Sequence, residues 1–283
     1  MSERLADVGR RVATVRQLGS VVKAMRGIAA SRAQQGRALL PAVRAYADVA
    51  SRALGQALLL DESVSPAFSA APAPEAGLIL FGAEQGFAGA FPEAVLEAAT
   101  SVLKSNHVFV VGSRTAALAR ERGVVVGQTF AGPMRAAAIA GVAVLLVESV
   151  YEYMRTSGAT QIEMIYPVPA VGRGRTLARK SLLPLEPSQF ATGTATEPPL
   201  IQLPVGWLLE RLGEEYVFAS LCEAATESFA AENEARVATM AAAASNVEAK
   251  LAALQSLERL TRQEDVTAEV VELASAARSR RRI

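Results

Sequence analysis

Apolar residues in the first part of the chain recur every three or four positions. Their mean spacing is close to 3.5 residues, the period of the seam of a left-handed coiled coil, and the pattern continues to about residue 60. Several glycines interrupt it, and each costs about 1 kcal/mol of helix propensity, so the helix needs a partner. We expect a kink at Pro41. The apolar positions are Leu5, Val8, Val12, Val15, Leu18, Val22, Met25 and Ala29.

The C-terminal part of the chain carries a second helical pattern without helix breakers. Neither glycine nor proline follows Gly213 as far as Ile283. At 1.5 Å per residue, a helix over residues 208–278 is about 105 Å long, far beyond the usual helix of about 11 to 12 residues. No compact domain buries such a helix alone, so we expect it to pair with the N-terminal helix. Its predicted seam is Val247, Leu251, Leu254, Leu257 and Leu260.

The middle of the chain alternates short β-branched runs with helical segments. This alternation, after a Pro/Ala/Ser-rich linker at 61–76, predicts a small α/β domain with a mostly parallel sheet covered on both faces. A proline-rich loop follows at 186–206. The predicted strands are 77–81, 107–112, 123–127 and 161–168, and the predicted helices are 92–104, 114–121 and 136–155.

Together these patterns predict an α/β fold with long helices. The N- and C-terminal helices form an antiparallel two-helix coiled coil, and the central domain is Rossmann-like. The expected parts are an N-terminal coiled-coil helix at 1–60, an α/β domain at 76–186 and a C-terminal coiled-coil helix at 208–283.

The composition of the chain excludes several classes of function. The formal net charge of +1 gives no whole-chain argument for nucleic acid or an anionic membrane, and aromatic residues make up only 5%. One cysteine, Cys222, excludes an internal disulfide, and one histidine, His107, excludes most histidine-based catalysis. The N-terminus lacks the apolar core of a signal peptide. The apolar run at 136–147 is shorter than the roughly 20 residues of a membrane span, so we interpret it as a buried helix of a soluble protein.

The candidate chemistry is sparse. The glycine-rich stretch FGAEQGFAGAF at 81–91 follows a strand and precedes a helix, but it matches neither phosphate-binding glycine motif, which favours a tight turn. Ser113 is expected to cap the following helix. We expect no catalytic residue, cofactor or metal. The tail ARSRRRI is either a solvated helix end or a contact for an acidic surface or phosphates.

Several stretches, in order along the whole chain, resemble the gamma subunit of F-type ATP synthases. KAMRGIAAS at 23–31 is similar to the family's K-A-M-x-M-V-A-A-S, and EQGFAGA at 84–90 to D-R-G-L-C-G-G. AENEARVATM at 231–240 resembles S-E-x-A-A-R-m-x-A-M, and residues 262–273 resemble R-Q-x-x-I-T-x-E-I-x-E-I.

The resemblance implies a central rotor shaft that performs no bond chemistry itself. Its implied partners are the α and β subunits of the catalytic hexamer, the epsilon subunit and the c-ring, at the cytoplasmic face of a bacterial inner membrane. It also implies fold-determining turns at Gly86 and Gly89. The implied contacts between rotor and stator are Lys23, Met25, Arg262, Gln263, Thr267 and Glu269.

Departures from the family pattern leave alternatives open. Gly27 stands where the family has a second methionine, and the arginine-rich tail replaces an apolar ending. Such changes are typical of a divergent branch, for example an alternative sodium-linked F-type ATPase, so either protons or sodium ions can be the coupling ion. Two other functions remain: a nucleotide-binding α/β enzyme with helical arms, and a coiled-coil scaffold or nucleic-acid adaptor.

Overall fold

The computed structural model describes residues 3–60, 76–101, 103, 106–169, 176–185, 190 and 200–280. The arginine tail at 281–283 and the linker at 61–75 lie outside these residues. Two long helices bracket a sheet: α1 spans Glu3–Leu58 and α5 spans Val205–Arg280. The chain forms two compact units. The helix-pair unit comprises Met1–Ile28 and Val237–Ile283, and the sheet unit comprises Ala29–Arg236.

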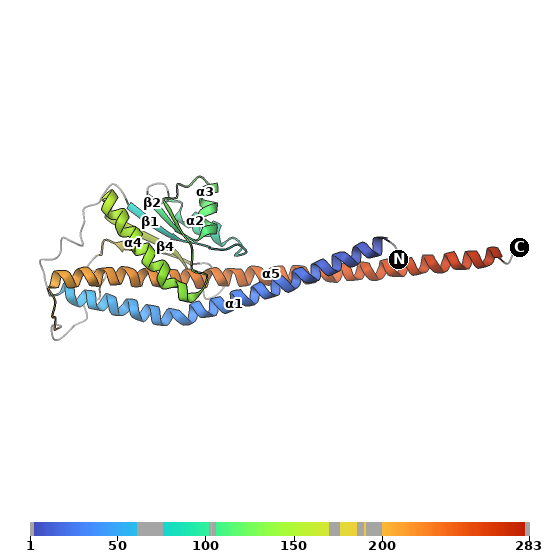
Figure 1. Ribbon diagram of the computed structural model, residues 1–283, viewed down its shortest axis with the longest axis horizontal. Helices are drawn as coiled ribbons and strands as arrows, with labels where there is room; N and C mark the ends of the chain where they lie inside the picture. Colours follow the sequence, from blue (N-terminus) through green and yellow to red (C-terminus); the bar gives the residue numbers. More distant parts are fainter. Residues whose placement is uncertain are drawn as a thin grey trace. The chain divides into compact units, whose positions relative to one another are not determined.

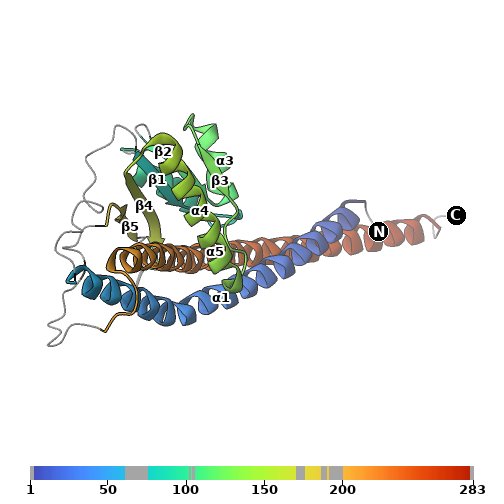
Figure 2. The same cartoon turned by 60° about the vertical axis from the view of Figure 1, so that its left-hand side comes forward.

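Within each unit, α1 and α5 run side by side in opposite directions (Figure 1, Figure 2). In the helix-pair unit, Val8 and Val12 pack against Leu254, whereas Val22 packs against Met240 and Ala244. Residues later in α1 therefore meet residues earlier in α5, which is the antiparallel order expected from the sequence.

The buried positions of α1 all fall on one seven-residue repeat, although Arg26, which stands at a position of the same repeat, is exposed. Gly19 lies on this seam against Val247, while Leu18 is 52% exposed, so its predicted place in the seam is wrong. Leu260 is likewise 53% exposed on α5, and Thr261 is buried in its stead. In both places the bulky leucine stands one position away from the seven-residue repeat, and its smaller neighbour occupies the repeat position. The buried α1 residues are Leu5, Val8, Val12, Val22, Ala29, Ala33, Gly36, Leu40, Ala47, Ala50, Leu54 and Ala57.

Small residues let the two helices approach closely in the sheet unit. A Cβ atom built on Gly36 would lie 3.0 Å from Ala230 Cβ and 3.3 Å from Ala230 Cα. Gly27 differs, because no atom lies within 4 Å of its Cβ position. Pro41 does not end α1, which continues through it to Leu58, and its ring lies on the exposed side of the helix.

The sheet has five strands in the order β3-β2-β1-β4-β5. Strands β1, β2, β3 and β4 are mutually parallel, and β5 joins the edge antiparallel to β4. The expected mostly parallel sheet is therefore confirmed. Strand β5 is missing from the prediction, because its polar residues interrupt the alternation of apolar and polar positions that is typical of a strand. The bounds are β1 Ala76–Phe81, β2 Asn106–Val111, β3 Gln128–Phe130, β4 Gln161–Val168 and β5 Thr176–Leu183.

Helices cover both faces of the sheet (Figure 1). Helices α2 (Phe91–Ala99) and α3 (Ser113–Glu121) pack on the face that carries Leu78 and Leu80. Helix α4 (Ile139–Ser157), preceded by a 3-10 turn at Ala136–Ala138, packs on the opposite face together with parts of α1 and α5. Successive strand residues point to opposite faces, so each strand contributes to both cores.

The predicted strand at 123–127 is wrong. Gly123 has a φ of +75° and follows α3, and the Val124 amide still bonds to the Ala119 carbonyl. The chain enters the sheet only after Gly127, where a Cβ atom would lie 2.2 Å from the His107 ring. Residues 124–126 are therefore a loop, and β3 is the short strand beyond it.

Helix α4 with its preceding turn is long and apolar enough to span a membrane by length and composition alone, which is weak evidence because core helices pass the same test. One of its faces packs in the core of the sheet unit through Ile139, Ala143, Leu146 and Val150. The expected burial therefore holds for this face, whereas Val144 and Leu145 on the same helix are 44% and 54% exposed.

Gly36 and Gly27 make a matched pair for testing the close approach of the helices. Gly36→Leu should lower the free energy of unfolding by about 1 to 3 kcal/mol, because the side chain has no space against Ala230. Gly27→Leu should raise it by up to about 1 kcal/mol, because leucine favours the helix and meets open space. Urea unfolding of the purified chain, followed by circular dichroism, measures both; equal effects would contradict the packing argument.

Candidate functional site

The loop between β1 and α2 forms hydrogen bonds with α5, with α1 and with the start of α3. Two of its residues have left-handed backbone conformations: Phe87, with a φ of +64°, and Gly89, with a φ of +62°. Glycine at position 89 therefore meets a conformational need. Gly86 has no such φ and no atom within 4 Å of its Cβ position, so its role as a fold-determining turn stays a prediction.

Glu84 places a carboxylate at the N-terminus of α3. Its oxygens accept hydrogen bonds from the Ser113 amide at 2.9 Å, the Ser113 hydroxyl at 3.0 Å and the Gly132 amide at 2.7 Å. Ser113 thus bonds to Glu84 and does not cap α3 as predicted; the N-cap residue is Gly112. Helix N-termini attract anions. Here a carboxylate of the chain itself fills the place that a phosphate would take.

A cluster of buried polar side chains on α5 forms hydrogen bonds with the same loop. We call it the Glu232–Arg236 cluster, and it also includes Asn233. The Glu232 carboxylate accepts hydrogen bonds from the amides of Glu84 and Gln85, each at 3.3 Å. The Arg236 guanidinium donates to the carbonyl oxygens of Gln85 and Gly86, each at 3.2 Å. Donors and acceptors on the helix therefore match acceptors and donors on the loop backbone.

The members of the cluster also bond to one another. Arg236 forms an ion pair with Glu232 and donates to Asn233 Oδ1 at 3.1 Å. The Asn233 amide in turn donates to the Phe229 carbonyl at 2.8 Å. A buried charge pair is tolerated only when its remaining hydrogen-bonding groups are satisfied, which is the situation here.

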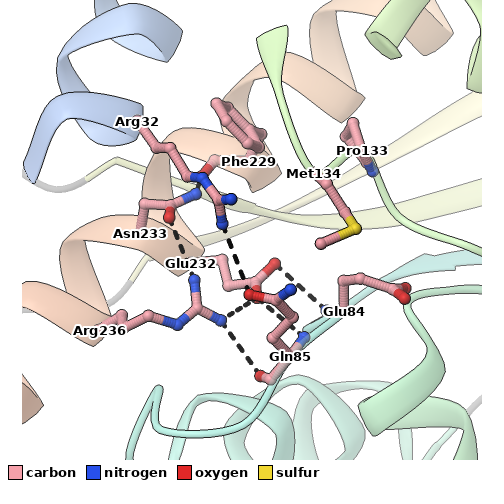
Figure 3. Close-up of a pocket in the computed structure, with 9 residues that line it drawn as sticks. All are labelled: Arg32, Glu84, Gln85, Pro133, Met134, Phe229, Glu232, Asn233 and Arg236. Carbon is pink, nitrogen blue, oxygen red and sulfur yellow. Dashed lines mark hydrogen bonds and ion pairs between the residues drawn. The ribbon is translucent and has the colours of Figure 1, made fainter. Parts of the chain in front are cut away.

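Figure 3 shows the cluster around a small hollow that is also lined by Arg32, Pro133, Met134 and Phe229. The hollow has a volume of about 10 Å³, room for one water molecule at most. Arg32 on α1 reaches Gln85 Oε1 at 3.5 Å. Elements from α1, α5 and two loops therefore meet here, but the space does not fit a nucleotide. Within the described ranges, no group of three His, Cys, Asp or Glu residues could hold a metal ion.

A second charged group joins α1 to α5 farther along the sheet unit. Arg44 pairs with Glu227 at 2.5 Å and with Glu223 at 3.4 Å. Burial raises the pKa of Glu227, although the hydrogen bond and charge of Arg44 oppose the rise. Burial also raises the pKa of nearby Tyr166 to about 12. Two further links between the helices are Arg37 to Glu234 at 2.6 Å and the Tyr46 hydroxyl to Glu215.

The predicted rotor–stator residues all lie in the helix-pair unit. Lys23 is exposed and pairs with Glu248 at 3.2 Å, and Met25 packs in part against Val22 and Met240. Arg262, Gln263, Thr267 and Glu269 are exposed along α5. The Thr267 hydroxyl bonds to the Gln263 carbonyl at 2.8 Å, and Arg262 reaches Glu258 at 3.5 Å. The structure thus brings Gln263 and Thr267 together, and their contact with a stator stays a prediction.

The sequence reasoning missed the Glu232–Arg236 cluster as a site. In the sequence these residues stand out only as part of the family motif at 231–240. The available signal was a glutamate four residues before an arginine, within a helical run that is otherwise small and apolar and therefore buried. Nothing in the sequence showed that the partner is the backbone of the 84–86 segment.

Comparisons with known proteins cover the whole chain. A family model described as ATP synthase matches residues 4–279. The ATP synthase gamma chain of Parafrankia sp. (strain EAN1pec) is 25% identical over 296 aligned positions, which cover 98% of each chain. That of Streptomyces coelicolor is 26% identical, with 98% of this chain and 96% of the relative covered.

Solved structures share the fold. A chain of the Euglena gracilis mitochondrial ATP synthase (OSCP/F1/c-ring) superposes with a TM-score of 0.68 at 14% identity, covering 98% of this chain and 94% of that one. A chain of the Tetrahymena thermophila mitochondrial ATP synthase (central stalk/c-ring) gives a TM-score of 0.59 at 18% identity, covering 79% and 99%.

The Arg44 pair yields a test of buried charge. Arg44→Ala should lower the free energy of unfolding at pH 7 by about 1 to 3 kcal/mol, because Glu227 is left buried without its cation, while Arg44 itself is half exposed and screened. Glu227→Gln should cost less, and Arg37→Ala, which breaks a more exposed pair, should cost under about 1 kcal/mol. Chemical unfolding of the three variants gives the order.

The free energy of unfolding should also depend on pH differently in the wild type and in Glu227→Gln. Because the folded pKa of Glu227 is raised, its contribution to stability is present below the unfolded pKa and is lost as the pH rises through the folded pKa. Glu227→Gln should therefore lose less stability than the wild type over this rise. A parallel pH profile for the two proteins would contradict the assignment.

Proposed function

The chain belongs to the ATP synthase family, as one of its gamma subunits, and we propose that it carries rotation between an ion-driven c-ring and a catalytic hexamer of α and β subunits. The observation that carries this proposal is the family match over residues 4–279, which includes both long helices and the whole sheet unit. In this role the chain makes and breaks no bonds. It couples distant sites through a rigid element.

The exposed surface of α5 supports a sleeve around the helix-pair unit. Arg4, near the start of α1, pairs with Glu264, and α5 continues from there to Arg280. A group of large apolar side chains is exposed along this stretch, and such a group marks an interaction surface. The proposed occupant is the inner wall of the α and β hexamer. The exposed residues are Val266, Val270, Val271 and Leu273.

Polar residues at separate levels of the helix pair would then favour particular angles of the rotor. We assign this role to Lys23 and Met25 on α1 and to Arg262, Gln263, Thr267 and Glu269 on α5. The exposure of the five polar side chains supports it, since they are available to a surrounding ring. The small residues of α1 and α5 suit the same purpose, because deep apolar interlocking would hold the rotor at one angle.

The remaining partners follow from the same role. The epsilon subunit and the c-ring would bind the sheet unit, and the complex would be peripheral at the cytoplasmic face of a bacterial membrane. Either protons or sodium ions can drive it. The nucleotide-enzyme alternative is disfavoured by Glu84, whose carboxylate occupies the anion site at α3. The nucleic-acid adaptor depended on the arginine tail, and residues 281–283 are outside the described ones.

Affinity purification of the tagged chain from its own cells tests the assignment. We expect α and β ATPase subunits to co-purify in a complex that hydrolyses ATP. Purification of the folded chain without them would overturn the proposed function.

Met25→Lys tests the sleeve contact. The lysine stem can replace the methionine against Val22 and Met240, so the chain should fold, but the added ammonium group would place a charge at a sleeve contact and uncouple ATP hydrolysis from ion pumping. We expect the purified complex to hydrolyse ATP with a reduced number of ions pumped per ATP. Met25→Leu, which adds no charge, is the control and should couple normally. Normal pumping per ATP in Met25→Lys would refute the contact.

A further inference from the structure

We propose that the Glu232–Arg236 cluster fixes the rotational position of helix α5 relative to the sheet, so that torque passes between them without slip. This inference rests on the proposed function. It adds positioning residues, none of which lies among the rotor–stator contacts assigned above.

The packing of α5 against the sheet explains why such a device is needed. Many of its buried residues between Ala219 and Ala231 are small, and apolar contact has no preferred direction. A helix with a smooth, small-residue surface resists removal from the core more strongly than it resists rotation about its own axis. Directional bonds are required to define its angle.

The Glu232–Arg236 cluster supplies these bonds at one level of the helix. Glu232 accepts two backbone amides of the loop, and Arg236 donates to two of its carbonyl oxygens. Because one position accepts and the other donates, a rotation of α5 breaks bonds of both kinds together. Elsewhere along α5, Lys180 of β5 reaches Ser220 at 3.4 Å and lies over the Tyr216 ring at 5.2 Å, both through the amine of one flexible side chain.

The loop is itself bonded to other parts of the sheet unit, so its hydrogen bonds with α5 hold the helix to a fixed segment. Glu84 holds it to Ser113 and to Gly132, and Arg32 on α1 reaches Gln85. All residues of the cluster and of the loop belong to the sheet unit. Arg236 is the last α5 residue of the sheet unit, and Arg32 stands close to Ala29, the first α1 residue of that unit.

The test replaces the cluster without leaving a buried charge. In the double variant Glu232→Gln with Arg236→Met both charges are removed together, an exchange that buried pairs tolerate. Single-molecule rotation of the complete, ATP-driven complex, with the probe attached to the sheet unit, measures the spread of angles at each pause. We expect a broader spread and a loss of ions pumped per ATP, with the hydrolysis rate and the thermal stability retained.

The matched control is Glu234→Gln with Arg37→Met, which removes an ion pair between α1 and α5 that does not touch the loop. Its pause angles should keep the width of the wild type. If the double cluster variant does not assemble, Arg236→Lys decides, since it keeps the charge beside Glu232 but loses the forked donation to Gln85 and Gly86. A wild-type width in the assembled cluster variant, or in Arg236→Lys, overturns the inference.

A variant in which the two charges are exchanged distinguishes the effect of the ion pair from that of the hydrogen bonds to the loop. Glu232→Arg with Arg236→Glu keeps opposite charges four residues apart, but it presents a donor to the loop amides and an acceptor to the loop carbonyls. We expect it to broaden the pause angles, and restoration of the wild-type width would show that the ion pair alone matters. Absence of rotation in the wild-type complex would overturn the proposed function instead.

Discussion

Neither long helix can be stable by itself, and the fold follows from that constraint. A helix of 56 residues with glycines in its interior, and one of 76 residues with a weakly apolar surface, gain too little from propensity alone. Each becomes stable by covering the other along a seven-residue repeat. In the helix-pair unit the buried α1 positions of this repeat are valine and leucine, whereas in the sheet unit, where the sheet also packs on the helices, they are mainly alanine and glycine.

The small residues between the two helices give little preference for one orientation of a helix over another, and polar contacts supply that preference. Alanine and glycine allow backbones to approach, as at Gly36 and Ala230, but they give little directional preference. Charged and hydrogen-bonded pairs supply it: Arg44 with Glu227, Arg37 with Glu234, and the Glu232–Arg236 cluster with the loop. The first two set the register of α1 on α5. The last joins α5 to the backbone of the sheet unit, and it is the most buried of the three.

Much of the fold could be predicted because its signals are periodic. The two helices, their antiparallel pairing and the strands β1, β2 and β4 follow from spacing and from β-branched runs. The predictions failed where a local sequence was ambiguous between neighbours. Leu18 and Leu260 are bulkier than Gly19 and Thr261, yet the smaller residues occupy the seam. The valines at 124–126 have strand propensity, but Gly123 and Gly127 and the packing around His107 delay the strand.

The candidate site was less accessible to sequence reasoning, for a physical reason. A buried ion pair on one helix reveals that something satisfies it, but its partners here are backbone amides and carbonyls, which every residue carries. No side-chain pattern at 84–86 could identify them. The same holds for Glu84, whose bonds at the start of α3 depend on how two strand ends lie beside each other. Gly27 is the reverse case: the sequence marks it as unusual, and nothing within 4 Å explains it. Since an exposed glycine weakens an isolated helix, the fold of the described residues gives no reason for a glycine at this position.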